Sequence, residues 1–279
     1  MNPYSMNALH TFLFGLLSRS LLAILLALGF AGCQSAAPRD SQTSFRVMTY
    51  NIHHGEGLDR KVNLQRIADL IKREQADIVA LQEVDKGVLR TGRRDLPAEL
   101  AALTGLTCIF SNNFTFQGGQ YGNAVLTRFP VNRWTNTHYK MLRPGEQRGL
   151  LQLVLDVHGR ELVFMDTHID YRGDDTERLQ NAAELHEVLR HYGGRPTILC
   201  GDFNDTPGSR THAKFAAAFI DAWAAAGAGE GFTIPAERPR KRIDYIWISK
   251  GAPLVPVKAW VPKSAASDHL PVVVELRFE

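Results

Sequence analysis

The stretch CGDFNDTP, residues 200–207, follows the strand-like run 197–199, and the stretch SDHLP, residues 267–271, precedes the apolar run 272–274. Short apolar runs bounded by turn residues predict buried strands. Each stretch therefore lies at a strand end, where rigid scaffolds present reactive side chains. The candidate residues of one hydrolytic site in these stretches are Asp202, Asn204, Asp268 and His269.

Other strand-like runs end in, or contain, residues able to carry chemistry. Three runs close on Asn51, Glu83 and His168. A fourth run contains Asp244 near its start, and Asp170 follows shortly after the run that ends at His168. Taken singly, each is more typical of a turn, a cap or a solvated side chain. The hypothesis of a shared site depends on the whole set.

The order of the predicted elements indicates an α/β (α+β) fold. Residues 63–74 carry an apolar stripe at helical spacing, residues 174–192 form a second such helix, and shorter helices are predicted at 96–104 and 211–218. Together they predict a four-layer αββα sandwich, two packed mixed β-sheets flanked by helices. The predicted strands cover residues 46–51, 77–83, 107–111, 123–127, 149–157, 161–168, 196–201, 242–248, 255–261 and 272–278.

The N-terminal 33 residues predict a secretory signal peptide. Arg19 is their only charged residue, and the apolar run 21–28 is followed by the small-residue stretch 29–33. Residues 34–44 read as a polar flexible tether. Residues 45–279 are then expected to form one catalytic domain.

Cys33 predicts a lipid anchor. The residues before it, Phe30-Ala31-Gly32, resemble a bacterial lipobox, although Phe30 stands where leucine is usual. Conventional cleavage nearby and an uncleaved anchor are the alternatives. In the lipoprotein family, Gln34 after the cysteine favours sorting to the outer membrane, so we expect a chain tethered there and facing the periplasm.

Charge and cysteine content narrow the function classes. Removal of residues 1–33 takes one of the 32 basic and none of the 29 acidic residues, which leaves a net charge of +2. Near-neutrality disfavours nonspecific binding of nucleic acid, which needs a basic face. Cys108 and Cys200 lie in strand-like runs and are expected to be buried free thiols.

The candidate residues suit metal-assisted hydrolysis. Carboxylates and an amide without cysteine are hard oxygen donors, which Mg²⁺ or Mn²⁺ prefers. An aspartate paired with His269 could orient the imidazole while the ring takes a proton from water. Two assignments stay open: Asp268 binds metal while Asp244 orients His269, or the reverse.

The ordered set of motifs resembles the endonuclease/exonuclease/phosphatase superfamily, which includes exonuclease III, DNase I, neutral sphingomyelinases and inositol-polyphosphate 5-phosphatases. The resemblance covers residues 45–279. The stretches 49–55, 122–128 and 242–246 most resemble a compact bacterial branch, similar to the nuclease-like domain of eukaryotic proteins that remodel lipid in glycosylphosphatidylinositol anchors.

The resemblance implies a role for each matching position. Glu83 would be the principal metal ligand, with Asn51 and Asp268 assisting. His269 would be the general base or a phosphate-contacting imidazole, oriented by Asp244. The residues that position the attacking water or contact the phosphoryl oxygens would be Asp202, Asn204 and His168.

The expected function is that of a membrane-tethered phosphodiesterase that cleaves phosphoesters such as lipid headgroups or GPI- and sphingomyelin-like phosphodiesters. Arg242, Arg90 and Asp170 are candidate substrate-binding residues, although charge runs are more often solvated. The alternatives are an envelope nuclease acting on DNA or RNA and a non-catalytic binding lipoprotein. We expect a monomer.

Overall fold

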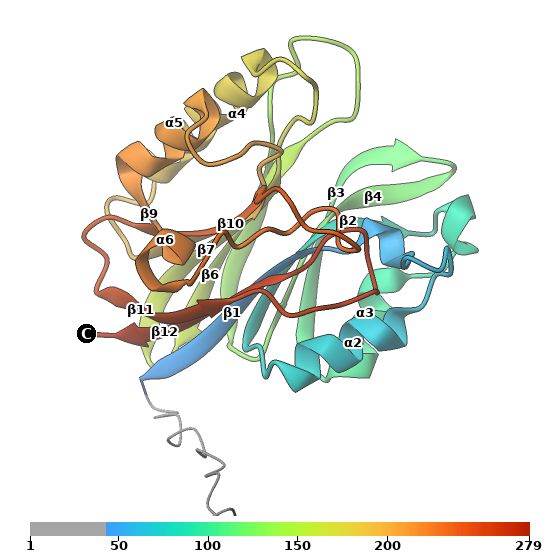
Figure 1. Cartoon of the computed structure of the whole chain (residues 1–279), viewed down its shortest axis with the longest axis horizontal. Coiled ribbons are helices and arrows are strands. Elements are labelled where there is room, and N and C mark those ends of the chain that lie inside the picture. Colours follow the sequence, from blue (N-terminus) through green and yellow to red (C-terminus); the bar gives the residue numbers. More distant parts are fainter. Residues whose placement is uncertain (1–42) are drawn as a thin grey trace, which may run out of the picture. The chain divides into compact units, whose positions relative to one another are not determined.

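The computed structural model describes residues 43–279, which form two six-stranded mixed sheets (Figure 1). The predicted signal peptide, Cys33 and the tether up to residue 42 lie outside the described residues. Among the residues that are described, no helix is both long and apolar enough to span a bilayer.

The first sheet has the strand order β11-β12-β1-β2-β4-β3. Its β1 and β2 are parallel, and the other neighbours are antiparallel. Its strands are β1 (Ser44–Asn51), β2 (Ile78–Lys86), β3 (Thr107–Phe116), β4 (Gly119–Thr127), β11 (Leu254–Trp260) and β12 (Val272–Phe278).

The second sheet has the order β5-β6-β7-β8-β10-β9. Here β7 and β8 form the parallel pair. Its strands are β5 (Val131–His138), β6 (Gly149–Val157), β7 (Arg160–His168), β8 (Thr197–Asp202), β9 (Phe219–Asp221) and β10 (Asp244–Ser249).

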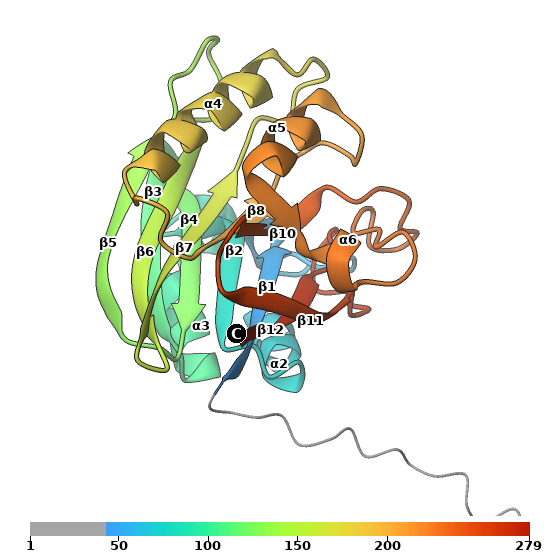
Figure 2. The same cartoon turned by 90° about the vertical axis from the view of Figure 1, so that its left-hand side faces the viewer.

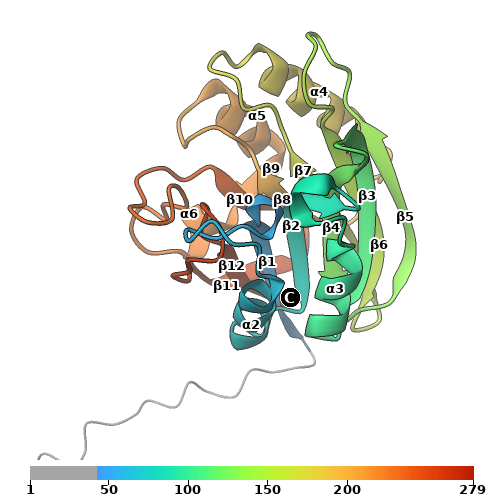
Figure 3. The ribbon, with the colours of Figure 1, turned by 90° about the vertical axis from the view of Figure 1, so that its right-hand side faces the viewer.

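Helices cover the outer faces of both sheets (Figures 2 and 3). Helices α2 (Leu64–Arg73) and α3 (Leu96–Thr104) pack on the first sheet, while α4 (Thr176–Arg190) and α5 (Arg210–Ala218) pack on the second. A third apolar cluster, including Phe45 and Phe164, fills the space between the sheets. The predicted four-layer sandwich is confirmed. The short remaining helices are η1 (His53–Gly55), η2 (Leu89–Thr91) and α6 (Ala222–Ala226).

Two strands were not predicted from the sequence. β5 is an edge strand whose side chains are mostly exposed or half-buried, and β9 has three residues. Neither carries the apolar run by which buried strands are recognised. Cys108 and Cys200 are free thiols as predicted; Cys200 is buried and Cys108 half-buried.

The topology brings the polar strand ends to one end of the molecule. β1 and β2 run parallel in the first sheet, and β7 and β8 run parallel in the second, so each pair ends at a common edge. In the second sheet His168 and Asp244 both lie directly opposite Asp202 in the strand register. Side chains from both sheets therefore meet at the edge where these strands end.

Candidate active site

Asn51 connects carboxylates from the two sheets. Its Nδ2 donates hydrogen bonds to Glu83 Oε1 at 2.9 Å and to Asp202 Oδ2 at 3.0 Å. Its Oδ1 accepts from the backbone N–H of His53 at 3.1 Å, which fixes the orientation of the amide. One buried side chain thus aligns the end of β2 with the end of β8.

The local backbone turns Glu83 toward the site. The pairing of β2 with β4 shifts register between Leu81 and Val84, and Glu83 there has a φ of 60°. Asn204 and His53 also have positive φ, at 49° and 44°. Left-handed backbone is unfavourable for such residues and tends to persist at functional sites, where the surrounding structure imposes it.

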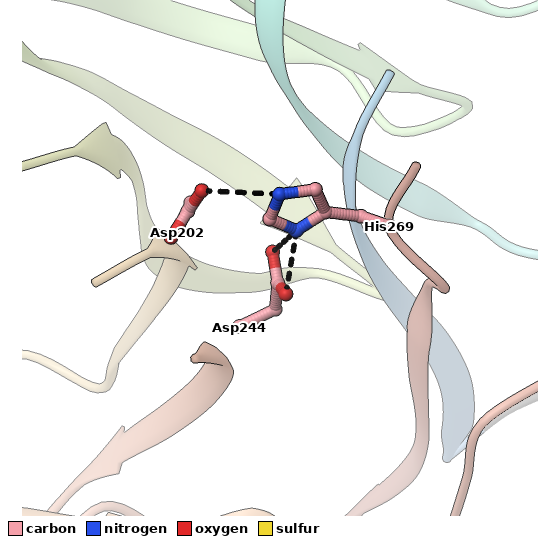
Figure 4. Close-up of side chains that lie close together, drawn as sticks. All are labelled: Asp202, Asp244 and His269. Carbon is pink, nitrogen blue, oxygen red and sulfur yellow. Dashed lines mark hydrogen bonds and ion pairs between the residues drawn. The ribbon is translucent and has the colours of Figure 1, made fainter. Parts of the chain in front are cut away.

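His269 pairs with Asp244 and faces Asp202 (Figure 4). Its Nδ1 lies 2.9 Å from Asp244 Oδ2, and its Nε2 lies 3.7 Å from Asp202 Oδ2. Burial lowers the pKa of His269, but Asp244, with Asp202 and Asp268, outweighs burial and raises it to about 10. Of the two open assignments, the geometry selects Asp244 as the residue that orients His269.

Asp202 has a raised pKa. Burial, and next the neighbouring Asp244, raise the pKa of its carboxyl to about 7, although His269 acts in the opposite direction. Gly201 before it has no room for a side chain, because an added Cβ would lie 2.0 Å from the Thr167 carbonyl. The close approach of β7 and β8 at this point sets the position of Asp202.

His168 is held as a neutral imidazole. Arg148, a residue that the sequence analysis missed, donates a hydrogen bond from Nη1 to His168 Nδ1 at 2.9 Å. Burial lowers the pKa of His168 well below its ordinary value, and Arg148 and His269 lower it further. Since Nδ1 accepts from the guanidinium, the proton of the neutral ring is on Nε2. That nitrogen lies 3.5 Å from Asp202 Oδ2. It also lies 3.0 Å from Asn204 Nδ2, from which it cannot accept in this tautomer, so the Asn204 amide donates to the Ile169 carbonyl at 3.1 Å.

A second set of buried polar residues lies between the sheets. Gln82 Nε2 donates to Asp166 Oδ1 at 2.6 Å and to Thr49 Oγ1 at 3.2 Å. Burial raises the pKa of Asp166 well above its ordinary value. Gln82 precedes Glu83 and Asp166 lies two residues before His168, so this contact couples the positions of the two strands.

The residues proposed to bind substrate have other partners. Arg242 is buried, bonds Asp221 Oδ2 at 2.7 Å and lies over the Tyr245 ring. Arg90 makes two hydrogen bonds to Asp85, at 2.8 and 2.9 Å. Asp170 likewise accepts from Arg172 Nη1 at 2.7 Å. The structure does not bring these three residues into the His269 group, and their role in binding stays a prediction.

The carboxylates fit a hard divalent cation. Within residues 43–279, Oε2 of the half-buried Glu83 accepts no hydrogen bond. Asn51 directs its amide nitrogen at Oε1 of Glu83, so Asn51 could bind a cation only through Oδ1, which here accepts from the His53 N–H. Asp268 is 46% exposed and lies 3.9 Å from His53 Nδ1. Asp202, Asp244 and His269 form a buried group whose ligand atoms lie within 4.8 Å of one another and could also hold an ion. Because Asp244 is engaged with His269, the favoured cation ligands are Glu83, Asn51 and Asp268.

The chain belongs to the Endonuclease/Exonuclease/phosphatase family, whose model matches residues 48–269. It is 30% identical over 253 residues to the uncharacterized protein YbhP of Escherichia coli K12, covering 85% of this chain and 98% of YbhP. The family consists of hydrolases that act on phosphoesters and generally use divalent metals.

Two solved structures illustrate the likeness. An endonuclease/exonuclease/phosphatase from Beutenbergia cavernae has 27% identity and a TM-score of 0.70, covering 85% of this chain and 72% of its own. The mannosyl-6-phosphatase Bt3783 of Bacteroides thetaiotaomicron has 20% identity and a TM-score of 0.72, covering 84% and 100%. The second likeness concerns the fold alone.

Proposed function

We propose that this chain is a phosphodiesterase that uses Mg²⁺ or Mn²⁺ and an activated water. The observation that carries the proposal is the arrangement of Asp202. Its Oδ2 lies 3.0 Å from Asn51 Nδ2, 3.5 Å from His168 Nε2 and 3.7 Å from His269 Nε2. One carboxylate oxygen thus faces three nitrogen groups that can bind an anionic phosphoryl group or a water.

Proton transfer is assigned to Asp202. A carboxyl group with a pKa of about 7 is matched to general base catalysis near neutral pH, so Asp202 would orient the water and accept its proton. His269, with its raised pKa, is protonated and would donate a hydrogen bond to the phosphoryl group. Asp244 holds that imidazolium in place.

Charge stabilisation is assigned to His168 and Asn204. Neutral His168 would donate from Nε2 to a phosphoryl oxygen, and the Asn204 amide would donate to a second. Preorganised donors in a site shielded from water stabilise the charge that develops during phosphoryl transfer. Glu83, Asn51 and Asp268 would hold the cation. The cation, when bound, polarises the phosphoryl group as a Lewis acid.

The test is hydrolysis of bis(p-nitrophenyl) phosphate with Mg²⁺ or Mn²⁺, with and without chelator. We expect activity that the chelator removes, and a loss of at least about 100-fold in Glu83→Gln and His269→Ala. His191→Ala, at an exposed histidine outside the site, serves as the matched control and should leave the rate unchanged. Undiminished turnover in His269→Ala would contradict the role assigned to His269. A p-nitrophenyl phosphate arm separates monoester from diester cleavage, since a structural relative is a mannosyl-6-phosphatase.

We further propose that the substrate is a lipid-headgroup phosphodiester and that Cys33 anchors the chain to the outer membrane, facing the periplasm. The anchor is supported by the lipobox-like sequence before Cys33. Cys33→Ser should move the chain from the membrane fraction to the soluble fraction. A substrate panel of phospholipids, nucleotides and DNA tests the headgroup proposal, and selective DNA cleavage would favour the nuclease alternative instead.

A further inference from the structure

Exposed apolar side chains lie on several segments beside the catalytic strand ends. Of the seven large hydrophobic residues exposed in the described part of the chain, four lie in segments that connect strands, one of them at the start of η2, and three lie on strands β5, β9 and β11. The four in connecting segments, named here the apolar rim, are Leu58, Leu89, Leu142 and Tyr171, which are 42%, 60%, 46% and 60% exposed.

Each segment of the apolar rim adjoins the end of a strand at the active-site edge. Leu58 follows β1, Leu89 follows β2, Leu142 precedes β6 and Tyr171 follows β7. The first, second and fourth loops leave the strands that carry Asn51, Glu83 and His168. Exposed leucines cost solvation free energy, and single ones are common. Four of the seven that are exposed in the described part of the chain lie beside strand ends of the site, and this concentration is what calls for a partner.

The apolar rim is fixed to the site by specific contacts. Arg172 Nη2 donates to the Pro144 carbonyl at 2.7 Å, which ties the loop of Tyr171 to the loop of Leu142. The ring of Tyr171 lies 5.6 Å from the guanidinium of Arg148, which itself bonds His168. A surface that touches Tyr171 is therefore two side chains away from the phosphoryl site.

An arginine lies beside each member of the rim. Arg60, Arg90, Arg143 and Arg172 each lie within two positions of a rim residue. The side chains of Arg60 and Arg143 are 84% and 40% exposed. Acidic residues share these loops: Glu56 pairs with Arg60, and Asp174 pairs with Arg143. The rim is thus apolar with balanced charge, which favours insertion into lipid over binding of a polyanion.

We infer that the apolar rim inserts into the surface of a phospholipid bilayer and places the catalytic edge against lipid headgroups. This inference rests on the proposed function for its substrate, and the membrane contact itself can be tested separately. Four apolar side chains on separate segments suit a fluid, deformable surface. The exposed guanidinium of Arg60 donates one hydrogen bond, to Glu56, so its other N–H groups can bind a headgroup phosphate.

The contact is tested with Tyr171→Trp in the full chain. Vesicles of phosphatidylethanolamine and phosphatidylglycerol with brominated acyl chains quench tryptophan that enters the lipid. Ile220→Trp is the matched control, because Ile220 is an exposed residue of β9 that pairs with Ile248, away from Asp244. We expect added quenching, relative to the parent chain, in Tyr171→Trp and none in Ile220→Trp. Equal quenching would show that the N-terminal segment alone associates with the bilayer and would overturn the inference.

The functional consequence is tested with a triple variant, Leu58→Ser, Leu89→Ser and Leu142→Ser. None of these residues belongs to the catalytic set. We expect about a 10-fold or greater loss of hydrolysis of vesicle-borne phospholipid, with the rate on bis(p-nitrophenyl) phosphate within about two-fold of the parent. Equal losses on both substrates would contradict the inference.

Two outcomes distinguish the membrane contact from the catalytic proposal and from nucleic-acid binding. Absence of any phosphoesterase activity, combined with selective quenching of Tyr171→Trp, would overturn the proposed function while supporting the membrane contact. The emission of Tyr171→Trp could instead change with DNA and not with vesicles. If that change is lost steeply as salt rises, the partner of the rim is a nucleic acid and not a bilayer.

Discussion

Arg148 donates a hydrogen bond to His168 across 2.9 Å, and this contact decides how His168 can act. An arginine is always charged and has no acceptor, so it selects the tautomer with Nδ1 free and Nε2 protonated. Both residues are buried, and Arg148 also pairs with Glu146 at 2.9 Å. The arginine positions a donor at the phosphoryl site.

We predict that Arg148→Gln raises the pKa of His168, because the replacement removes a neighbouring positive charge. The rate on bis(p-nitrophenyl) phosphate should fall by about 10-fold or more, and the loss should be greatest at low pH, where His168 is then protonated. NMR titration of the histidine ring protons measures the pKa directly. Arg148→Lys should restore part of the pKa shift, and an unchanged titration curve in Arg148→Gln would contradict the assignment.

We predict that Asp244→Asn lowers the pKa of His269 below its present value of about 10, because burial is then no longer outweighed by the paired carboxylate. The ring would lose its proton at neutral pH and no longer donate to phosphate. Turnover should fall by about 100-fold or more. The measurements are a histidine titration by NMR and a rate profile against pH. Asp69→Asn, on the exposed surface of α2, is the control.

We predict that Asp166→Asn makes stability less dependent on pH. Burial raises the pKa of Asp166 in the folded state. In the unfolded chain the same carboxyl loses its proton at about pH 4. Between that pH and the folded-state pKa, the free energy of unfolding of the parent therefore falls as pH rises. Asparagine cannot titrate, so the variant lacks this loss and gains relative stability with rising pH. Urea midpoints at a series of pH values measure the effect. A midpoint difference that stays constant with pH would contradict a raised pKa of Asp166 in the folded state.

We predict that Gly201→Ala destabilises the domain by about 2 kcal/mol or more, because its Cβ would lie 2.0 Å from the Thr167 carbonyl. The β7–β8 pair would have to separate where His168 lies opposite Asp202. Thermal unfolding and activity should therefore fall together. Gly173→Ala is the matched control, since nothing lies within 4 Å of its added Cβ and its φ is not positive.

Much of the fold was predictable because buried strands and amphipathic helices leave local patterns. Strand β8, with every residue buried, and helix α2, with one apolar face, were recognised from neighbouring residues alone. Strand β5 was missed because an exposed edge strand has no core-facing run. The bulge that turns Glu83 toward the site was also missed, because it is a property of the pairing between β2 and β4.

The sequence by itself determined the family, the four-layer fold and the residue types of the site, because apolar periodicity and motif order are local properties of the chain. Only the tertiary structure decided which residues act on one another. Asp244 and His269 are 25 positions apart, Arg148 and His168 are 20 apart, and Gln82 and Asp166 are 84 apart. Hydrogen bonds and pKa values depend on distances of a few ångströms and on burial. Those quantities exist only once two sheets have packed and water has been excluded from between them.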